Sequence, residues 1–290
     1  MSGIKKYFIT YGTKEFHLQK LHICNLAKKT NLFDETIALS PKDLDKNFVN
    51  EYSSIFSQPI GGGYYIWKFK IILDTLSKIK NDDFLFYIDA GSSINYKSKK
   101  TLQIYIDKLY SSKYDHAAFK MHHLQEKYWT TKEVFSYFNL DLESREANEG
   151  QYMATVLMFK KSKKSLDYLR SFEKVIQKDP QLITDFYLKN EQIKNFKFHR
   201  HDQSIFSLLN KIYGCEEFDS KETYFKENPK DQYNYPILTV RKRVYKFHQK
   251  VMFFIKYPIN INKVLYFKEK PTLVEKVIFK ISKKLHHFFY

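Results

Sequence analysis

The chain contains few of the residues that build disulfide-rich, fibrous or linker-like proteins. Its 290 residues include 2 cysteines, 8 glycines and 7 prolines. Cys24 and Cys215 are too few for a disulfide scaffold or a Cys-rich zinc site, and they are typical of a reducing compartment. The low glycine and proline contents exclude collagen-like and low-complexity chains. Hydrophobic residues make up 43% of the chain and aromatic residues 18%, which is ample for a packed core.

Long apolar runs and acidic residues are also scarce. No stretch reaches the roughly 18 to 20 apolar residues of a membrane-spanning helix. The opening MSGIKKYFITYGTKEF lacks the apolar core and cleavage site of a secretory signal, so we expect a cytoplasmic protein. Lys and Arg number 49 against 32 Asp and Glu, and the net charge of +17 predicts anionic partners. Nucleic acid, an anionic membrane and phosphorylated small molecules all satisfy that expectation.

Strand-like and helix-like segments alternate along most of the chain. Strands are predicted by β-rich or apolar runs at 5–11, 36–39, 83–88, 117–121 and 152–159. Helices are predicted at 14–29, after Ser40-Pro41, after the triple glycine 61–63, at 99–110, from Thr130, at 163–178 and at 202–213. Thr130 and Glu133 have the spacing of a capping box. This alternation predicts an α/β fold with helices flanking a mixed, mostly parallel sheet.

The last forty residues have a different composition. Residues 251–290 interleave Lys with Phe, Leu, Ile and Tyr, and contain hardly any acid. On a helix from about Thr272, Val277, Ile281 and Leu285 share an apolar face with their neighbours. A basic amphipathic helix favours an anionic membrane surface, and the alternative is a helix docked on the domain with its Lys face in water. We therefore divide the chain into one domain, 1–250, and a basic tail, 251–290.

Three short segments contain the residues best suited to chemistry. Asp89 directly follows the apolar run DFLFYI, and the carboxyl end of such a strand faces the ligand crevice of an α/β sheet. It is suited to hold a divalent metal on a diphosphate or to accept a ribose hydroxyl, unless it merely caps the turn. Trp67 and Lys68 open a helix, where an anion is favoured, although Trp67 is equally typical of a core anchor. Asp202 opens another helix, which it is placed to cap.

Four segments resemble bacterial GT-A-type nucleotide-sugar glycosyltransferases, above all the small enzymes of capsule and lipopolysaccharide biosynthesis. They are GGGYYIWKFKIILDTL (61–76), DDFLFYIDAGSSIN (82–95), EGQYMATVLMFKKS (149–162) and HRHDQSIFSLL (199–209), within a matching region of roughly 5–213. The resemblance implies a GT-A-like, Rossmann-like fold over 1–250. It also implies a hexosyltransferase that moves a sugar from a UDP-linked or similar donor to a growing surface glycan or lipid-linked acceptor. With the basic tail, it implies a peripheral place on the inner face of the cytoplasmic membrane.

The resemblance also implies a nucleotide and metal site. Tyr11 and Gly12 would receive the base, and Lys68 with Trp67 would lie near the diphosphate. The family's Asp-any-Asp metal motif stands here as Asp89-Ala90-Gly91, so the second carboxylate is missing at Gly91. Either Mn²⁺ or Mg²⁺ is held by Asp89, phosphates, water and His248, or Lys and Arg side chains neutralise the diphosphate.

The reacting groups stay open between two acids. The Asp202-Gln203 pair resembles one that borders the sugar in retaining galactosyltransferases of this fold. An inverting enzyme instead needs a carboxylate about 3 Å from the acceptor hydroxyl, and Asp202 and Glu149 are the candidates. Arg200 is placed to stabilise the departing diphosphate.

Two alternative functions remain. A nucleic-acid-binding protein would suit the charge and the 23 Tyr and 26 Phe, but no recognition module is present, so no nucleic-acid partner is expected. A catalytically inactive glycosyltransferase-like scaffold would explain the missing carboxylate at Gly91.

Overall fold

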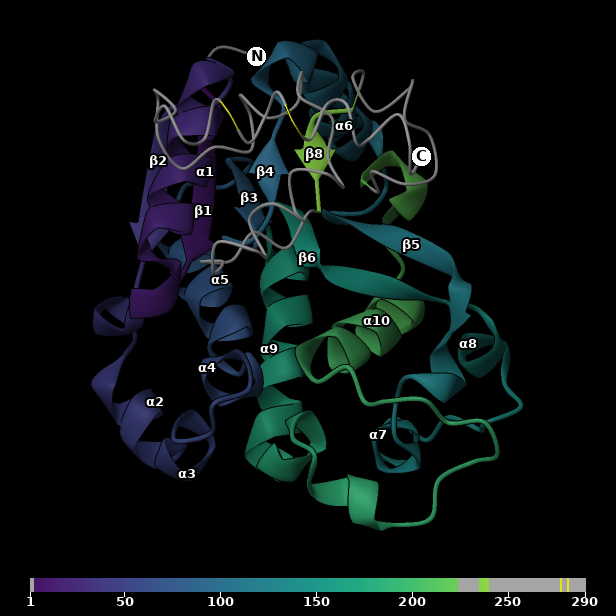
Figure 1. The fold of residues 1–290 in the computed structure, drawn as a ribbon. Coiled ribbons are helices and arrows are strands. Elements are labelled where there is room, and N and C mark those ends of the chain that lie inside the picture. The colour runs from purple at the N-terminus through teal and green to yellow at the C-terminus, as the bar shows by residue number, and fades with distance from the viewer. Residues whose placement is uncertain (1–2, 224–234, 240–276, 278–280, 282–290) are drawn as a thin grey trace. The chain divides into compact units, whose positions relative to one another are not determined.

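The computed structural model describes residues 3–223, 235–239, 277 and 281, and its strands and helices alternate along the chain (Figure 1). The chain divides into two compact units. Unit 1 comprises Met1–Tyr7, Ser40–Ile88 and Ile106–Ser220, and unit 2 comprises Phe8–Leu39, Asp89–Tyr105 and Lys221–Tyr290. The proposed boundary at residue 250, His248 and the tail apart from Val277 and Ile281 lie outside the described residues.

Four strands of unit 1 form the sheet that supports the candidate site. They lie in the order β3 (Phe84–Ile88), β6 (Gly150–Lys160), β5 (His116–Gln125) and β7 (Glu216–Asp219). β6 pairs antiparallel with β3 and β5, whereas β7 pairs parallel with β5. Three strands therefore run one way and β6 runs the other, which confirms the predicted mixed, mostly parallel sheet. Every residue of β3 is buried, as its unbroken apolar sequence predicted.

Helices pack on this sheet through aromatic side chains. α9 (Lys163–Lys178) lies between α5 (Trp67–Lys78) and α10 (Asp202–Tyr213) and packs against both (Figure 1). The Phe172 ring of α9 lies 4.8 Å from Phe69 of α5 and 4.5 Å from Phe206 of α10. α10 also packs against β6. The first residues of α5 and α10 are thereby fixed in one rigid framework. The shorter helices are α2 (Lys46–Glu51), α3 (Ser53–Phe56), α4 (Gly61–Tyr64), α7 (Lys132–Tyr137) and α8 (Arg145–Asn148).

Unit 2 contains smaller elements. β1 (Lys6–Tyr11) begins in unit 1 and ends in unit 2, where it neighbours β2 (Glu35–Leu39). α1 (His17–Lys29) follows β1, and β4 (Ser93–Ile94) pairs antiparallel with β8 (Ile237–Leu238). α6 (Lys99–Ser111) begins in unit 2 and ends in unit 1. The two-residue strands β4 and β8 are too short to give a sequence pattern of their own. Within the described residues, no helix combines the length and the apolar character needed to cross a membrane.

The capping box predicted at Thr130 is wrong. α7 begins at Lys132 with Thr131 at the N-cap position. The Thr130 hydroxyl instead donates to Glu126 at 2.6 Å, while Glu133 accepts hydrogen bonds from Asn190 and Gln192. Thr130 thus bonds to the nearby Glu126 and Glu133 to a distant segment, because a buried carboxylate such as Glu126 needs donors more than a helix end needs a cap.

Candidate functional site

The segment labelled α4, together with Tyr65, forms a left-handed turn before α5. Five consecutive residues, from Gly61 to Tyr65, have positive φ angles of 57°, 62°, 96°, 52° and 62°. Glycine adopts this conformation freely, whereas each tyrosine adds about 1–2 kcal/mol of backbone strain. A Cβ atom on Gly63 would lie 3.0 Å from Phe56 Cα and 3.1 Å from the Ile55 carbonyl oxygen. The triple glycine therefore builds a tight turn rather than leading straight into a helix.

This turn positions the first two residues of α5. The Trp67 indole N–H donates to the Gly61 carbonyl at 2.9 Å, and Trp67 is buried. Lys68 is only 2% exposed, and its ammonium nitrogen lies 5.1, 5.9 and 5.5 Å from the ring centres of Tyr65, Trp67 and Tyr87. Aromatic faces attract a cation at such distances, so the rings partly replace the water that Lys68 has lost.

Lys68 forms a buried ion pair with Asp202. Its Nζ lies 2.6 Å from Asp202 Oδ2, with the two side chains 2% and 5% exposed. Nζ also donates to the Ala154 carbonyl of β6 at 3.1 Å. In general, an ammonium at such a distance favours the ionised form of a carboxylate. The helix-cap interpretation of Asp202 is wrong, because His201 occupies the N-cap position of α10 and Asp202 is its first residue.

His201 introduces a second strained residue next to the ion pair. Its φ of 52° and ψ of −121° are unusual for a residue with a side chain. Its ring lies 4.9 Å from that of Tyr64, and Nδ1 lies 3.1 Å from the Ile183 carbonyl oxygen. Burial lowers the pKa of His201, although Asp185 opposes this effect. The strained turn before Lys68 and the strained residue before Asp202 thus touch each other, and such strain accumulates at functional sites.

Gln203 and Arg200 flank Asp202. The Gln203 side chain donates to Gln151 Oε1 at 2.6 Å and accepts from the Ala154 backbone N–H at 3.4 Å. Its amide keeps one N–H and one oxygen lone pair to which no described residue is bonded. The Arg200 guanidinium lies over the Trp129 ring, 4.3 Å from its centre. Of these three residues, Asp202 is in contact with Lys68, and Gln203 and Arg200 are its near neighbours along the chain.

Glu149 belongs to a different cluster. Its Oε2 lies 2.9 Å from Lys120 Nζ and its Oε1 accepts from Arg145. Lys120 also pairs with Glu217 at 3.2 Å. Burial raises the pKa of Glu149, but the hydrogen bonds from Lys120 and Arg145 outweigh it and lower the net value. Since both carboxylate oxygens are engaged by cations, Glu149 is poorly suited to accept a proton.

The remaining predicted residues lie in unit 2. Tyr11 is 4% exposed, and Gly12 donates its N–H to the Leu39 carbonyl at 3.2 Å. A Cβ on Gly12 would lie 2.8 Å from Phe16 Cβ, so any side chain at this position would collide with Phe16. Asp89 and Gly91 follow β3 as predicted and are half-buried.

The described residues supply no complete metal cage. Among them, no three His, Cys, Asp or Glu side chains gather closely enough to bind an ion. At the metal motif Asp89 is one carboxylate, and a hard cation requires several oxygen ligands.

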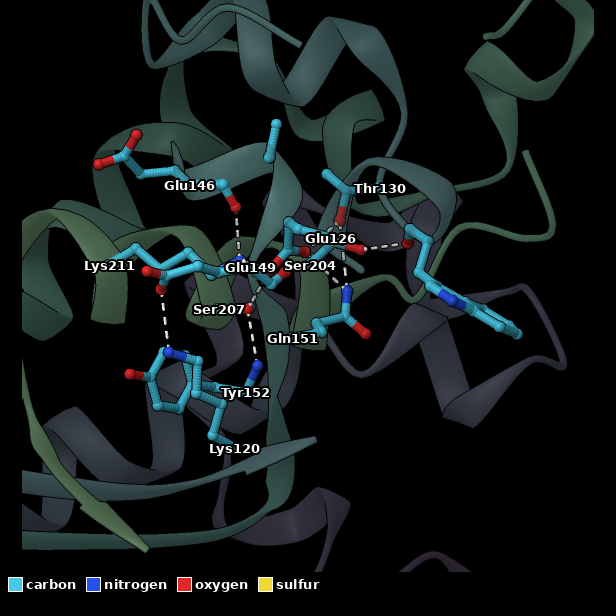
Figure 2. A network of polar contacts seen from close by, with 12 residues as sticks. Lys120, Glu126, Thr130, Glu146, Glu149, Gln151, Tyr152, Ser204, Ser207 and Lys211 are labelled. Atoms are coloured by element: carbon cyan, nitrogen blue, oxygen red, sulfur yellow. Dashed lines mark hydrogen bonds and ion pairs between the residues drawn. The ribbon is translucent and has the colours of Figure 1, made fainter. Parts of the chain in front are cut away.

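Sequence reasoning missed a buried polar network centred on Glu126 (Figure 2). Glu126 is fully buried and pairs with Lys211 at 2.9 Å. It also accepts from Thr130 at 2.6 Å, from Gln151 at 2.8 Å and from the Ser207 hydroxyl. Lys211 donates further to the backbone carbonyls of residues 146 and 149, at 2.6 and 3.3 Å. No local sequence pattern marks Glu126, because its partners beyond Thr130 come from two other segments, β6 and α10.

Comparisons with known proteins place the chain beside several solved structures. No protein-family model matches the sequence, and a search of curated proteins gives no match. A glycosyltransferase involved in glycosylation of the major capsid of PBCV-1 is 11% identical, with a TM-score of 0.45 over 81% of this chain and 91% of that one. Mouse xyloside xylosyltransferase 1 is 10% identical, with a TM-score of 0.40 over 81% and 97%. The galactosyltransferase LgtC is 10% identical, with a TM-score of 0.38 over 80% and 86%.

Proposed function

We propose that this chain is a glycosyltransferase that moves a hexose from a UDP-linked sugar to a growing glycan. The observation that carries the proposal is the buried Lys68–Asp202 pair, held between two strained segments with Gln203 beside it. The resemblance of the four sequence segments to bacterial capsule and lipopolysaccharide enzymes supports the same assignment and suggests a surface glycan as acceptor.

The transfer requires positioning and charge stabilisation more than covalent chemistry from the protein. Asp202, ion-paired with Lys68, is suited to accept hydrogen bonds from sugar hydroxyls, and Gln203 adds one donor and one acceptor. An ion-paired carboxylate is a weak base, so we assign Asp202 to the donor sugar rather than to deprotonation of the acceptor. Arg200 contributes positive charge as the bond between the sugar and the diphosphate breaks.

Three further residues singled out in the sequence would serve the nucleotide. We propose that Tyr11 and Gly12 contact the base and that Asp89 lies toward the diphosphate. A bound Mn²⁺ or Mg²⁺ would neutralise the diphosphate charge, with Asp89 as its ligand.

A thermal-shift screen tests the assignment. The probes are UDP, UDP-glucose, UDP-galactose and UDP-N-acetylglucosamine, each with and without Mn²⁺. A ligand that binds only the native state raises the melting temperature, by about 2.7 kcal/mol of stabilisation at 100 times its Kd. We expect at least one UDP-sugar to stabilise the protein more than UDP does. No shift with any of the four probes would contradict the proposal.

We further propose that residues 251–290 hold the enzyme on the anionic inner face of the cytoplasmic membrane, beside a lipid-linked acceptor. Of the predicted apolar face, the structure describes Val277 and Ile281, which are helical and 52% and 51% exposed. Each Lys near an anionic leaflet contributes about 1 kcal/mol of attraction. Full-length protein should co-sediment with anionic vesicles at low salt, and protein truncated after Gln249 should not. Equal pelleting of both forms would contradict this role of the tail.

A further inference from the structure

The buried carboxylate of Glu126 determines how its neighbours are oriented. It is ion-paired with Lys211 and accepts hydrogen bonds from Thr130, Ser207 and Gln151 (Figure 2). An ionised carboxylate can only accept hydrogen bonds. Every neutral partner must therefore turn a donor toward Glu126, and Gln151 must present its NH₂ group.

This constraint passes along two side-chain amides to the candidate site. Because the Gln151 NH₂ faces Glu126, its carbonyl oxygen faces Gln203 and accepts from Gln203 Nε2 at 2.6 Å. Gln203 must then direct its oxygen toward the Ala154 N–H, at 3.4 Å. Gln151 is fully buried, so water does not replace either contact. The charge on Glu126 thus fixes which end of the Gln203 amide lies on each side.

We propose that Glu126 is a positioning residue that sets the orientation in which Gln203 meets the donor sugar. The proposal rests on the proposed function, in which Gln203 contacts that sugar. Glu126 acts only through Gln151 and Gln203, and Lys211 Nζ lies 2.9 Å from its carboxylate.

The substitution Glu126→Gln should reverse the order of donors. Lys211 would attract the new amide oxygen, so the amide NH₂ would face Gln151. Gln151 would then turn its own NH₂ toward Gln203, and Gln203 would turn its NH₂ toward the Ala154 N–H. The Gln203 NH₂ and the Ala154 N–H would then face each other as two donors. Gln203 must either rotate away from Ala154 or keep the reversed orientation and leave the Ala154 N–H without an acceptor. In either case the donor sugar meets the wrong atoms.

The test compares binding of the UDP-sugar selected by the thermal-shift panel with binding of UDP alone. Glu126→Gln should weaken UDP-sugar binding about tenfold, the effect of losing roughly one good hydrogen bond. It should change UDP binding less than twofold, because UDP lacks the sugar. Asp115→Asn is the matched control, since it removes a carboxylate from the Lys160 ion pair and should leave both affinities unchanged. General damage to the fold would instead weaken UDP and UDP-sugar together.

Two further variants test the connection itself. In Glu126→Gln/Lys211→Met the ammonium is gone, so the amide oxygen can again face Gln151 and UDP-sugar affinity should recover. We call the series of hydrogen bonds from Glu126 through Gln151 to Gln203 the relay. In Gln203→Ala its last side chain is missing, so adding Glu126→Gln should cause no further loss of UDP-sugar affinity. Additive losses, or no recovery in the double variant, would overturn the relay.

A readout without ligand separates this inference from the proposed function. In Glu126→Gln the Ala154 N–H loses the Gln203 oxygen as its acceptor, so its hydrogen exchange should become about fivefold faster. The double variant with Lys211→Met should return the exchange rate to the wild-type value. Unchanged exchange together with unchanged UDP-sugar binding would overturn the relay alone. If Gln203→Ala binds UDP-sugar like wild type, the place of Gln203 in the proposed function fails instead. Should Glu126→Gln not fold, Gln151→Met breaks the same connection and keeps the ion pair, and wild-type UDP-sugar affinity in that variant would overturn the relay.

Discussion

Unit 1 contains two buried pairs of a lysine and a carboxylate that differ in their surroundings. Glu126 and Lys211 are enclosed by hydrogen-bonding groups on relaxed backbone, and four donors converge on the one carboxylate. Lys68 and Asp202 are equally buried but lie among aromatic rings, and residues with positive φ precede both of them.

The contrast separates a structural role from a reactive one. A buried ion pair is costly unless hydrogen bonds satisfy it, and the Glu126 network meets that condition. The Lys68–Asp202 pair adds backbone strain to the cost of burial, which stability alone does not explain. Gln151 and Gln203 connect the Glu126 network to the backbone of Ala154, whose carbonyl accepts from Lys68, so the satisfied pair can hold the strained one in place.

The largest effect is expected from Asp202→Asn. Removing the charge next to the donor sugar should lower the transfer rate of folded protein by about 10² to 10³. The rate of sugar transfer per folded molecule is the measurement. The control is Asp115→Asn, which should retain the wild-type rate within about twofold. A wild-type rate in Asp202→Asn would contradict the functional role of the Lys68–Asp202 pair.

Glu126→Leu should mainly reduce stability. It leaves Lys211 charged and unpaired in the interior, which typically costs about 3–5 kcal/mol in the free energy of unfolding. Urea unfolding measures this change. Asp74→Leu removes the carboxylate of the half-buried Lys70–Asp74 pair on α5, and should cost less than about 1 kcal/mol. Equal losses in the two variants would show that the buried Glu126 network contributes no more to the free energy of unfolding than a half-buried ion pair does.

Two glycine substitutions separate strain at the site from strain elsewhere. Gly63→Ala and Gly214→Ala each place a side chain at positive φ, 96° and 72°, with Cβ contacts of 3.0 and 2.5 Å. Both should lower the free energy of unfolding by about 1–3 kcal/mol. Only Gly63→Ala should also lower the transfer rate of folded protein, because that turn positions Lys68. Equal transfer rates in the two variants would contradict the link between the turn and catalysis.

Acid should lower the free energy of unfolding through His199, a buried histidine close to Asp202 in the sequence. Burial lowers the pKa of His199 from 6.5 to about 3. Between these values the unfolded chain binds a proton that the native state excludes, so stability falls as pH decreases below 6.5. His199→Gln should reduce the slope of unfolding free energy between pH 6.5 and 4.5 by about 1.2 kcal/mol per pH unit on average. Substituting the exposed His122 by Gln should leave the slope unchanged, and equal slopes in both variants would contradict the expectation.

The elements with strong local patterns were predictable from the sequence. The apolar run of β3 and the amphipathic helices α9 and α10 are confirmed, since burial of their own residues determines them. The conformation of Tyr64 and Tyr65 was not predictable, because tyrosine rarely adopts positive φ and only tertiary packing enforces it.

The candidate site was predictable only as separate residues. Lys68 and Asp202 were each singled out for their place at a helix start. Their ion pair depends on α5 and α10 packing on the same sheet, which no local spacing encodes. Glu126 was missed for the same reason, and its recruitment of Thr130 also explains the wrong capping box.

The most direct test of the account is an experimental structure of the protein with the UDP-sugar selected by the thermal-shift panel. We predict hydroxyl oxygens of the sugar within about 3.2 Å of the Asp202 carboxylate and the Gln203 amide. The Lys68–Asp202 pair should remain intact beneath the sugar. A sugar bound elsewhere, with Asp202 and Gln203 untouched, would contradict the central claim.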